Sequence, residues 1–188
     1  MIQIIDTALP DVKILVPRRI SDQRGFFSEV WNARDFASAE IDAAFVQDNH
    51  VRNQFKGTLR GLHYQVPPAA QGKLVRVTRG AVVDAAVDIR RGSPTFGRSC
   101  TVVLSADNWY QIWVPPGFAH GYCTLEDDTE VQYKVTDFYS SPHERGIAWN
   151  DPQLAIPWPV TPETATVSER DRMLPCLAGQ PDLFEYRA

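Results

Sequence analysis

Short runs of strand-type residues, separated by turn-forming clusters, constrain the fold of this chain more than any other feature. In Lys73 to Arg79, apolar and basic residues alternate with a period of two, as in a strand with one buried face. Gly80 interrupts this pattern, and an extended apolar run resumes from Ala81 to Ile89. Further runs of this kind are Cys100 to Leu104, Gln111 to Val114 and Thr129 to Phe138. Strands at intervals of about ten residues indicate an antiparallel sandwich or barrel.

Helix is scarce in the sequence. One short helix is expected from Ala33 to Ala44, with Asn32 as its N-cap, and another is expected to start near Ser168. From Trp149 the chain becomes rich in proline, which predicts an irregular arm that wraps the barrel. Because there is no internal repeat, linker or low-complexity tract, we expect residues 1–188 to form a single domain that is mainly β.

The composition argues against several classes of protein. A net charge of −4 disfavours a general nucleic-acid surface. No run approaches the roughly 18 apolar residues of a membrane helix, and the N-terminus lacks the basic and apolar segments of an export signal. Three cysteines at wide spacings argue against a disulfide framework and a zinc knuckle. We therefore expect a cytoplasmic protein that binds neither nucleic acid nor membranes.

The residues that carry chemistry concentrate between Gly57 and Gly80. Five residues separate Gly57 from His63, six separate Lys73 from Gly80, and residues 115–120 read Pro-Pro-Gly-Phe-Ala-His. These spacings resemble the two motifs of the cupin superfamily of small β-barrels, G-x5-H-x-H-x3,4-E-x6-G and P-x-G-x2-H-x3-N. In metal-binding cupins, the two histidines and the glutamate of the first motif and the histidine of the second hold one divalent ion inside the barrel.

Two of these four ligand positions are altered in this chain. His63 and His120 remain, whereas Gln65 replaces the second histidine and Lys73 replaces the glutamate. A protonated lysine has no lone pair for a metal and repels a divalent ion at short range. A fixed positive charge can instead stabilise a developing oxyanion, as a Lewis-acidic metal would. We therefore expect a site without a metal and without another cofactor.

His63, considered alone, would most simply be a hydrogen-bonded histidine of a barrel interior. Its sequence neighbours argue for a functional role instead. Arg60, Gln65 and Lys73 add more polar groups than an ordinary barrel interior holds, because each buried polar group needs a partner.

Over nearly its whole length the chain resembles the dTDP-4-dehydrorhamnose 3,5-epimerase family of non-metal cupins. Ordered blocks carry this resemblance, each of them weak alone. The blocks in the first half of the chain are Asp22 to Glu29, Phe45 to His50, Leu59 to Gln65 and Gln71 to Val77. The blocks in the second half are Val87 to Arg90, Ser93 to Gly97, Gly117 to Gly121, Tyr133 to Asp137, Trp149 to Pro152 and Ser168 to Asp171.

The resemblance implies a substrate and a catalytic set. The implied substrate is a dTDP-linked 4-keto-6-deoxyglucose, which is inverted at carbons 3 and 5 without a cofactor. The hydrogens on those carbons are α to the C4 ketone, so their removal gives an enolate, and histidine is a suitable base at neutral pH. By resemblance, His63 is this base and Asp171 orients it. Lys73 would bind the enolate oxygen, and Tyr133 would transfer a proton on the opposite face.

Without the resemblance, these residues have simpler readings. Tyr133 would pack within a strand, and Asp171 would be a first-turn helix acid favoured by the helix dipole. His120 would be a remnant of the second cupin motif that packs under the site. The resemblance implies instead that His120 makes a polar contact to the sugar or the diphosphate.

The nucleotide half of the substrate needs donors for its diphosphate, and arginine suits it through its bidentate fork. The resemblance implies Arg24 and Arg60 for this role, with Arg170 as a third candidate where relatives usually carry lysine. The remaining binding positions that it implies are Phe27, Glu29, Gln47, Asn49, Gln65, Tyr139 and Glu144, with Tyr139 stacked on the thymine. Without the resemblance, Arg24 and Glu29 would belong to a surface turn and an ion pair of little energetic value.

In this family the N-terminal strands cross to a partner subunit, so we expect a homodimer, in keeping with the prevalence of twofold symmetry. Arg24 and Glu29 would then complete either their own site or that of the partner. One segment departs from the family pattern. Residues 51–56 form a longer link than the Ser-rich link of relatives, and they approach the binding blocks.

Three alternatives stay open. An epimerase that inverts only carbon 3 or only carbon 5 of a related dTDP-4-keto sugar would use the same residues. A metal-dependent cupin oxygenase or isomerase is disfavoured by Gln65 and Lys73. A non-enzymatic sugar-nucleotide binding module would not require His63, Lys73 and Tyr133 together. The exact sugar product and the preference between thymidine and uridine also stay open.

Overall fold

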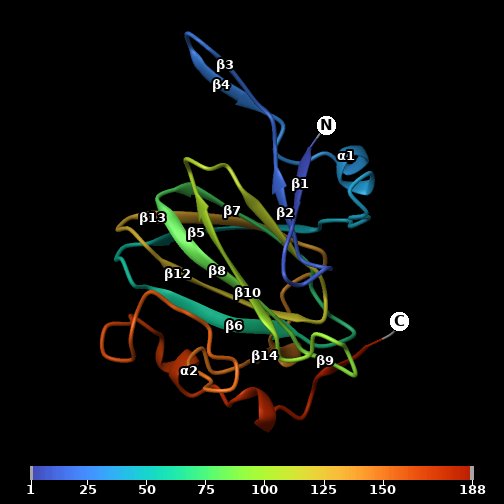
Figure 1. Cartoon of the computed structure of the whole chain (residues 1–188), viewed down its shortest axis with the longest axis vertical. Coiled ribbons are helices and arrows are strands. Elements are labelled where there is room, and N and C mark those ends of the chain that lie inside the picture. The colour runs from blue at the N-terminus through green and yellow to red at the C-terminus, as the bar shows by residue number, and fades with distance from the viewer. Residues whose placement is uncertain (1, 187–188) are drawn as a thin grey trace.

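Two antiparallel sheets form the body of the protein, as seen in the computed structural model, which describes residues 2–186 (Figure 1). The six-stranded sheet has the order β1 (Gln3–Asp6), β2 (Lys13–Val16), β11 (Gln111–Val114), β7 (Lys73–Arg79), β13 (Thr129–Val135) and β5 (Gln47–Asn53). The five-stranded sheet has the order β10 (Ser99–Ser105), β8 (Ala81–Asp88), β12 (Phe118–Thr124), β6 (Leu59–Gln65) and β14 (Glu144–Gly146). The expectation of a mainly β fold is therefore confirmed.

Runs of strand-type residues bounded by turn clusters are the strands that the sequence predicts best. The runs Lys73–Arg79 and Gln111–Val114 are strands with the expected bounds. The run that was expected to reach Phe138 ends at Val135. No alternation predicts β12, because all seven of its residues are buried, and none predicts β5, because polar residues occupy both of its faces. Since β5 extends to Asn53, half of the expected 51–56 link is strand.

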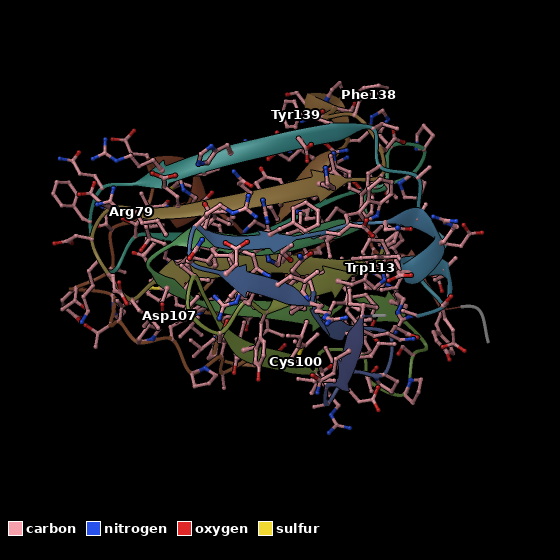
Figure 2. All side chains as sticks on the ribbon, turned by 90° about the horizontal axis from the view of Figure 1, so that it is seen from above. Arg79, Cys100, Asp107, Trp113, Phe138 and Tyr139 are labelled. Atoms are coloured by element: carbon pink, nitrogen blue, oxygen red, sulfur yellow. The ribbon has the colours of Figure 1, made fainter. Side chains whose placement is uncertain are left out.

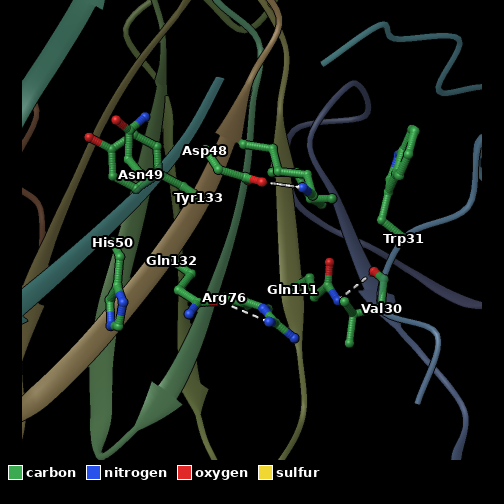
Figure 3. A pocket seen from close by; sticks show the side chains of 11 residues that line it. Val30, Trp31, Asp48, Asn49, His50, Arg76, Gln111, Gln132 and Tyr133 are labelled. Carbon is green, nitrogen blue, oxygen red and sulfur yellow. Dashed lines mark hydrogen bonds and ion pairs between the residues drawn. The ribbon is translucent and has the colours of Figure 1, made fainter. Parts of the chain in front are cut away.

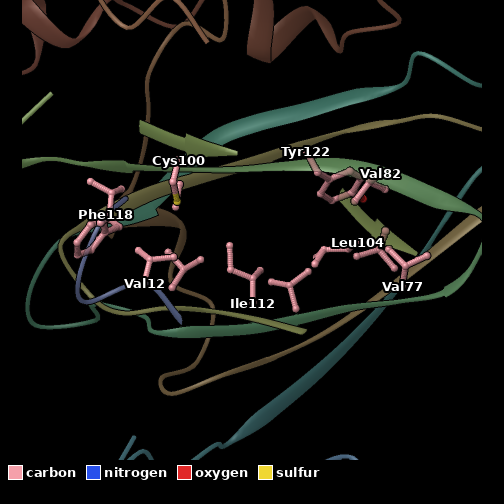
Figure 4. Packing of buried hydrophobic residues seen from close by; sticks show 13 residues of the cluster. Val12, Val77, Val82, Cys100, Leu104, Ile112, Phe118 and Tyr122 are labelled. Atoms are coloured by element: carbon pink, nitrogen blue, oxygen red, sulfur yellow. The ribbon is translucent and has the colours of Figure 1, made fainter. Parts of the chain in front are cut away.

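The space between the sheets is filled by alternate side chains of the strands. Along β7, Val75 and Val77 point into this space, whereas Leu74 belongs to a cluster on the outer face. Figure 4 shows the cluster between the sheets, with Ile112, Leu104 and Phe118 among its members. Lys73 precedes Val75 by two residues, so the same alternation directs its side chain inward.

The outer face of the five-stranded sheet is covered by the C-terminal arm, as the proline content predicts. The arm lies across β6 and β14 in Figure 1, and its Leu154, Ile156 and Leu177 pack against Leu62 and Ile147. Hydrogen bonds of the buried Asp151 and Gln180 side chains hold the arm in place. The arm carries α2 (Glu169–Arg172), with Ser168 as its N-cap as the sequence indicates, and η2 (Leu177–Gly179). Its end, β15 (Phe184–Glu185), pairs in parallel with β9 (Arg90–Arg91).

The helix expected from Ala33 to Ala44 is wrong in length. Asn32 caps α1 (Ala33–Ala37) as expected, because its side chain accepts hydrogen bonds from the Arg34 and Asp35 amides. The chain then leaves the helix at Glu40, which has a left-handed φ of 61°. The Ile41 amide reaches back to the Phe36 carbonyl, which is the bond of a Schellman end. Phe36 and Ile41 are buried together against the six-stranded sheet.

A hairpin of β3 (Arg19–Asp22) and β4 (Gly25–Ser28) projects from the body of the protein (Figure 1). It leaves Ile20, Phe26 and Phe27 more than half exposed, at 54%, 55% and 66%. Exposed apolar side chains gathered on one hairpin are typical of an interaction surface. No helix within residues 2–186 is long and apolar enough to cross a membrane.

Adjacent residues of β10 give a test of this packing. Leu104 is 0% exposed between the sheets, whereas Val103 is 47% exposed on the same strand. We expect Leu104→Ala to lower the free energy of unfolding by about 2–5 kcal/mol, because it leaves a cavity in the core. Val103→Ala should lower it by less than about 1 kcal/mol. Urea denaturation measures both, and equal losses would contradict the assigned orientation of β10.

Candidate active site

A cavity of about 500 Å³ opens between the sheets under the C-terminal arm. Four strands and the arm supply its polar lining, because alternate residues of these strands face inward. The sequence-predicted residues that line it are Arg60, His63, Lys73, His120, Tyr133, Arg170 and Asp171. The four proposed catalytic residues thus lie around one cavity, although His63 and Asp171 are 108 positions apart in the sequence.

His63 and Asp171 form the central pair of this cavity. His63 Nε2 lies 2.8 Å from Asp171 Oδ1, and the Gly61 amide donates to Asp171 Oδ2 at 3.3 Å. Burial favours the neutral acid, but the hydrogen bonds from His63, Gly61 and Ser168 hold the pKa of Asp171 below its usual value. An ionised Asp171 accepts the proton on Nε2, which leaves Nδ1 of the half-buried ring for a substrate.

Strands β6 and β12 approach each other closely at Gly61, the residue whose amide donates to Asp171. A Cβ on Gly61 would lie 2.5 Å from Gly121 Cα, and a Cβ on Gly121 would lie 2.7 Å from the Arg60 carbonyl oxygen. Both positions therefore need glycine. The pairing of the two strands shifts register between His120 and Tyr122, at this point of close approach.

Lys73 and Tyr133 lie on neighbouring strands of the opposite sheet. Lys73 Nζ donates to the His63 carbonyl at 3.3 Å, and burial lowers the pKa of this lysine to about 8. Burial also raises the pKa of Tyr133, although the charge of Arg60 opposes this effect. Tyr133 is therefore a neutral phenol that can donate a proton at neutral pH, whereas Lys73 can lose its charge in the mildly alkaline range.

His120 is the direct strand partner of His63, and it has a carboxylate of its own. The His120 Nε2 atom lies 3.0 and 2.9 Å from the two oxygens of Asp84, a residue of β8. Sequence reasoning missed Asp84. A signal for it was present, because Asp84 interrupts the apolar run of β8 and is 0% exposed.

A second cavity of about 160 Å³ adjoins the first, and His63, Lys73 and Tyr133 line both. Its remaining lining contains five predicted binding residues, namely Gln47, Asn49, Gln65, Tyr139 and Glu144. The Tyr139 hydroxyl donates to Glu144 at 2.7 Å, and its amide donates to Gln47 at 3.1 Å. Tyr139 projects at the rim beside β5, next to Phe138 (Figure 2).

The amide of Gln65 is largely occupied by the backbone. Its nitrogen donates to the carbonyls of Ala69 and Phe138 at 2.6 and 3.2 Å, and its oxygen accepts from the Ser140 amide at 2.8 Å. Both hydrogens of the amide are thereby used. Gln65 thus holds the rim of the second cavity, with one oxygen lone pair left for a ligand.

Two arginines lie where the cavities open. The Arg60 Nε atom donates to Asn53 Oδ1 at 2.8 Å, and within residues 2–186 the terminal nitrogens of its fork have no hydrogen-bond partner. Sequence reasoning missed Asn53, whose side chain is buried at the end of β5. Arg170 pairs with Glu144 at 2.7 Å and so links the two cavities. This ion pair and Tyr139 hold the pKa of Glu144 low against the effect of burial.

Arg24, Phe27 and Glu29 lie apart from this site in the single chain. Arg24 is on the projecting hairpin, where it forms an ion pair with Asp22 at 2.6 Å. Phe27 and Glu29 line a separate cavity of about 210 Å³ beside α1, and Glu29 accepts from Asn32 at 2.6 Å. The sequence-predicted binding set is therefore divided between two places in one chain.

A further hollow, of about 260 Å³, lies on the outer face of the six-stranded sheet (Figure 3). Arg76, Gln132 and Trp31 line it, with Tyr133 at its edge. The buried Trp31 Nε1 is without a hydrogen-bond partner among the described residues. Within residues 2–186, no group of three His, Cys, Asp or Glu side chains is arranged to hold a metal ion.

Comparison with known proteins identifies close relatives. The family model described as dTDP-4-dehydrorhamnose 3,5-epimerase matches residues 6–179. The dTDP-4-dehydrorhamnose 3,5-epimerase of Sinorhizobium fredii is 48% identical over 179 residues, which are 95% of this chain and 91% of that protein. The structure of a Legionella pneumophila dTDP-6-deoxy-D-glucose-3,5-epimerase in complex with dTDP-4-keto-L-rhamnose is 45% identical, covers 100% of both chains and has a TM-score of 0.94.

A more distant relative has a narrower activity. The structure of a 3'-monoepimerase from Streptomyces bikiniensis in complex with dTDP-quinovose is 31% identical, covers 92% of this chain and 87% of that chain, and has a TM-score of 0.85. The family model matches most of the chain, and members of the family are similar to it over nearly its full length. Both findings agree with the histidine–carboxylate pair and the lysine in the cavity described above. The chain belongs to the dTDP-4-dehydrorhamnose 3,5-epimerase family and shares its cupin-type fold.

Proposed function

We propose that this epimerase inverts carbons 3 and 5 of dTDP-4-dehydro-6-deoxy-D-glucose and so forms dTDP-4-dehydro-L-rhamnose. The hydrogen bond between His63 and Asp171 in the 500 Å³ cavity is the observation that carries this proposal. An oriented imidazole is a base of the right strength for hydrogens α to a ketone. The activity of relatives at about half identity supports the same substrate.

The reaction follows from the chemistry of three side chains. His63 Nδ1 removes the proton from the carbon α to the ketone, and the electron pair of the C–H bond moves onto the C4 oxygen as an enolate. The Lys73 ammonium stabilises this oxyanion by a charge-assisted hydrogen bond. Tyr133 then donates its phenolic proton to the opposite face of the same carbon, which completes the inversion. Solvent restores the proton of Tyr133 and removes the one from His63.

The nucleotide would occupy the side of the cavities that the arginines and Tyr139 line. The free nitrogens of Arg60 suit the diphosphate, and Arg170 would exchange its ion pair with Glu144 for a phosphate oxygen. Tyr139, which is 56% exposed, offers a ring face for the thymine. Gln47 and Asn49 would accept and donate hydrogen bonds to the hydroxyls of the sugar and the nucleoside.

Inversion at a single carbon is the second candidate, because a 31% identical relative is a 3'-monoepimerase. His63, Lys73, Tyr133 and Asp171 would serve that reaction equally well. An assay in deuterated water separates the two candidates. We expect the wild-type enzyme to incorporate deuterium at both carbon 3 and carbon 5 of the product, as read by mass spectrometry and NMR. Label at one carbon only would reject the double epimerase, and absence of exchange would reject the proposed function.

The role of Asp171 can be tested with a change that keeps its size. Asp171→Asn replaces the carboxylate that holds Nε2 protonated with an amide whose NH2 group can donate to Nε2 and so favour the wrong tautomer. We therefore expect the rate of deuterium exchange to fall by about 10²–10⁴-fold. Glu169→Gln, in the exposed first turn of the same helix, is the matched control and should keep the wild-type rate. Calorimetry with dTDP should give similar affinities for all three proteins. A fall in exchange of less than tenfold in Asp171→Asn would contradict the orienting role.

The separation of Arg24, Phe27 and Glu29 from the cavity supports a homodimer with shared sites. We propose that the β3–β4 hairpin crosses to the partner subunit, where Arg24 binds the diphosphate beside the His63 of that subunit. The exposed phenylalanines of the hairpin would be covered by this contact. Twofold symmetry would then complete both sites.

Mixed dimers test this arrangement. Arg24→Ala and His63→Asn should each be nearly inactive alone. When the two variants are unfolded together and refolded, each mixed dimer would regain one intact site, so activity should recover to about a quarter of the wild-type value. If Arg24 served the site of its own chain, mixing would restore no activity. Size-exclusion chromatography with light scattering serves as the control for dimer formation.

A further inference from the structure

Asp84 is a buried acid that the proposed mechanism does not use. It lies on the inner face of β8 and is 0% exposed. Both of its oxygens contact His120 Nε2, at 3.0 and 2.9 Å, and His120 lines the 500 Å³ cavity. The geometry therefore matches that of the His63–Asp171 pair on the adjacent strand. The cavity contains two histidine–carboxylate pairs, one partly open and one enclosed.

A carboxylate in this position needs compensation, because burying a charge is costly unless it is paired. The groups that face the interior around Asp84 come from every adjacent strand and from the rim. They are His63 on β6, Lys73 on β7, Cys100 on β10, His120 and Tyr122 on β12, Tyr133 on β13, Glu144 on β14 and Arg60 at the rim. Lys73 is the lysine of this set, and its side chain faces the space between the sheets, as that of Asp84 does. The charge of Asp84 raises the pKa of Lys73 against the larger, lowering effect of burial.

Another acid on the same strand shows what a purely structural role looks like. Asp88 is also 0% exposed, but its partners come from a local turn. It accepts from Arg90 Nε at 2.9 Å, from Ser93 Oγ at 2.6 Å and from Thr95 Oγ1 at 2.6 Å. These bonds close the loop after β8 and lie outside the two cavities of the candidate active site. Asp84 instead faces the cavity through His120.

We propose that Asp84 is a positioning residue of the epimerase site, which orients the His120 ring toward the cavity and supplies the counter-charge that keeps Lys73 an ammonium ion. The inference rests on the proposed function, since it gives Lys73 the task of binding the enolate oxygen. His120, held through Nε2, presents Nδ1 to the sugar. Without Asp84, Lys73 would lose its proton at a lower pH, and the oxyanion would lose its partner.

The test compares Asp84→Asn with Asp88→Asn, a matched pair of isosteric changes on one strand. Lys73 is followed by the NMR titration of its side chain in labelled protein, with Lys73→Arg used to assign the signal. In the wild type we expect a midpoint of about 8. Asp84→Asn should lower this midpoint by about one pH unit, as loss of a neighbouring opposite charge does. Asp88→Asn should leave the midpoint unchanged, even where it lowers the melting temperature.

Catalysis gives the second readout. The rate of deuterium exchange of the wild type should fall as pH rises through about 8, because Lys73 loses its proton there. In Asp84→Asn this alkaline limb should move down by about one unit, so the loss relative to wild type should be roughly fivefold greater at pH 8 than at pH 6. A merely structural role would lower the rate by the same factor at every pH.

Several results would overturn the inference. An unchanged Lys73 midpoint in Asp84→Asn, or an equal shift in Asp88→Asn, would reject it. Should Asp84→Asn fail to fold, the wild type still provides the test, because the Asp84 carboxyl carbon must sense the titration of Lys73 near pH 8. If that signal did not move with Lys73, the inference would be wrong. Wild-type protein without deuterium exchange would reject the proposed function instead, and the NMR titration would still be readable.

Discussion

The alternation of side chains along β7 is the constraint on which the active site depends. Val75 and Val77 must face the core between the sheets, and the same period of two carries Lys73 inward with them. A lysine in that position is costly because its charged form loses water. The hydrogen bond from Lys73 Nζ to the His63 carbonyl offsets part of this cost, and we propose that the charge of Asp84 offsets more of it. A shift of β7 by one residue would expose the valines and remove the ammonium from the cavity together.

The pairing of His63 with Asp171 joins the barrel to its C-terminal arm. The proposed base, His63, comes from β6, and its partner comes from the short helix α2, 108 residues later. The arm is therefore part of the site as well as a cover for an apolar sheet face. Buried polar contacts fix its course. The Tyr64 hydroxyl donates to Gln180 at 3.1 Å, and the Leu177 amide donates to Asp151 at 2.7 Å. An acid that orients a base needs such support, because small displacements of a catalytic group reduce the rate strongly.

Different parts of this structure could be predicted from the sequence to different degrees. A strand with alternating residues, such as β7, follows from its period of two, and β11 follows from its run of strand-type residues between turn clusters. The fully buried β12 and the polar β5 do not, because neither has a period of two. The end of α1 at Glu40 depends on a local backbone conformation that has no clear signal in a helical stretch.

The site residues show the same division. Spacing alone made His63 and Lys73 notable, because they occupy ligand positions of a metal-binding motif. The partnership of His63 with Asp171 came from the family resemblance, since no local pattern connects residues so far apart. Asp84 could have been suspected as a charged residue within an apolar strand. The contact between Asn53 and Arg60 depends on how β5 ends beside β6, which the sequence does not specify.

The wall that His63, Lys73 and Tyr133 form between the two cavities has an evolutionary consequence. A substitution in this wall alters both cavities at once, so it cannot change the lining of one cavity without that of the other. Residues that line a single cavity are free of that restriction. Thr58 and Thr166 contact only the larger cavity of this pair, and Gln47 and Gln71 only the smaller. Divergence toward new deoxysugars would therefore accumulate at these margins, while the dividing wall stays the same.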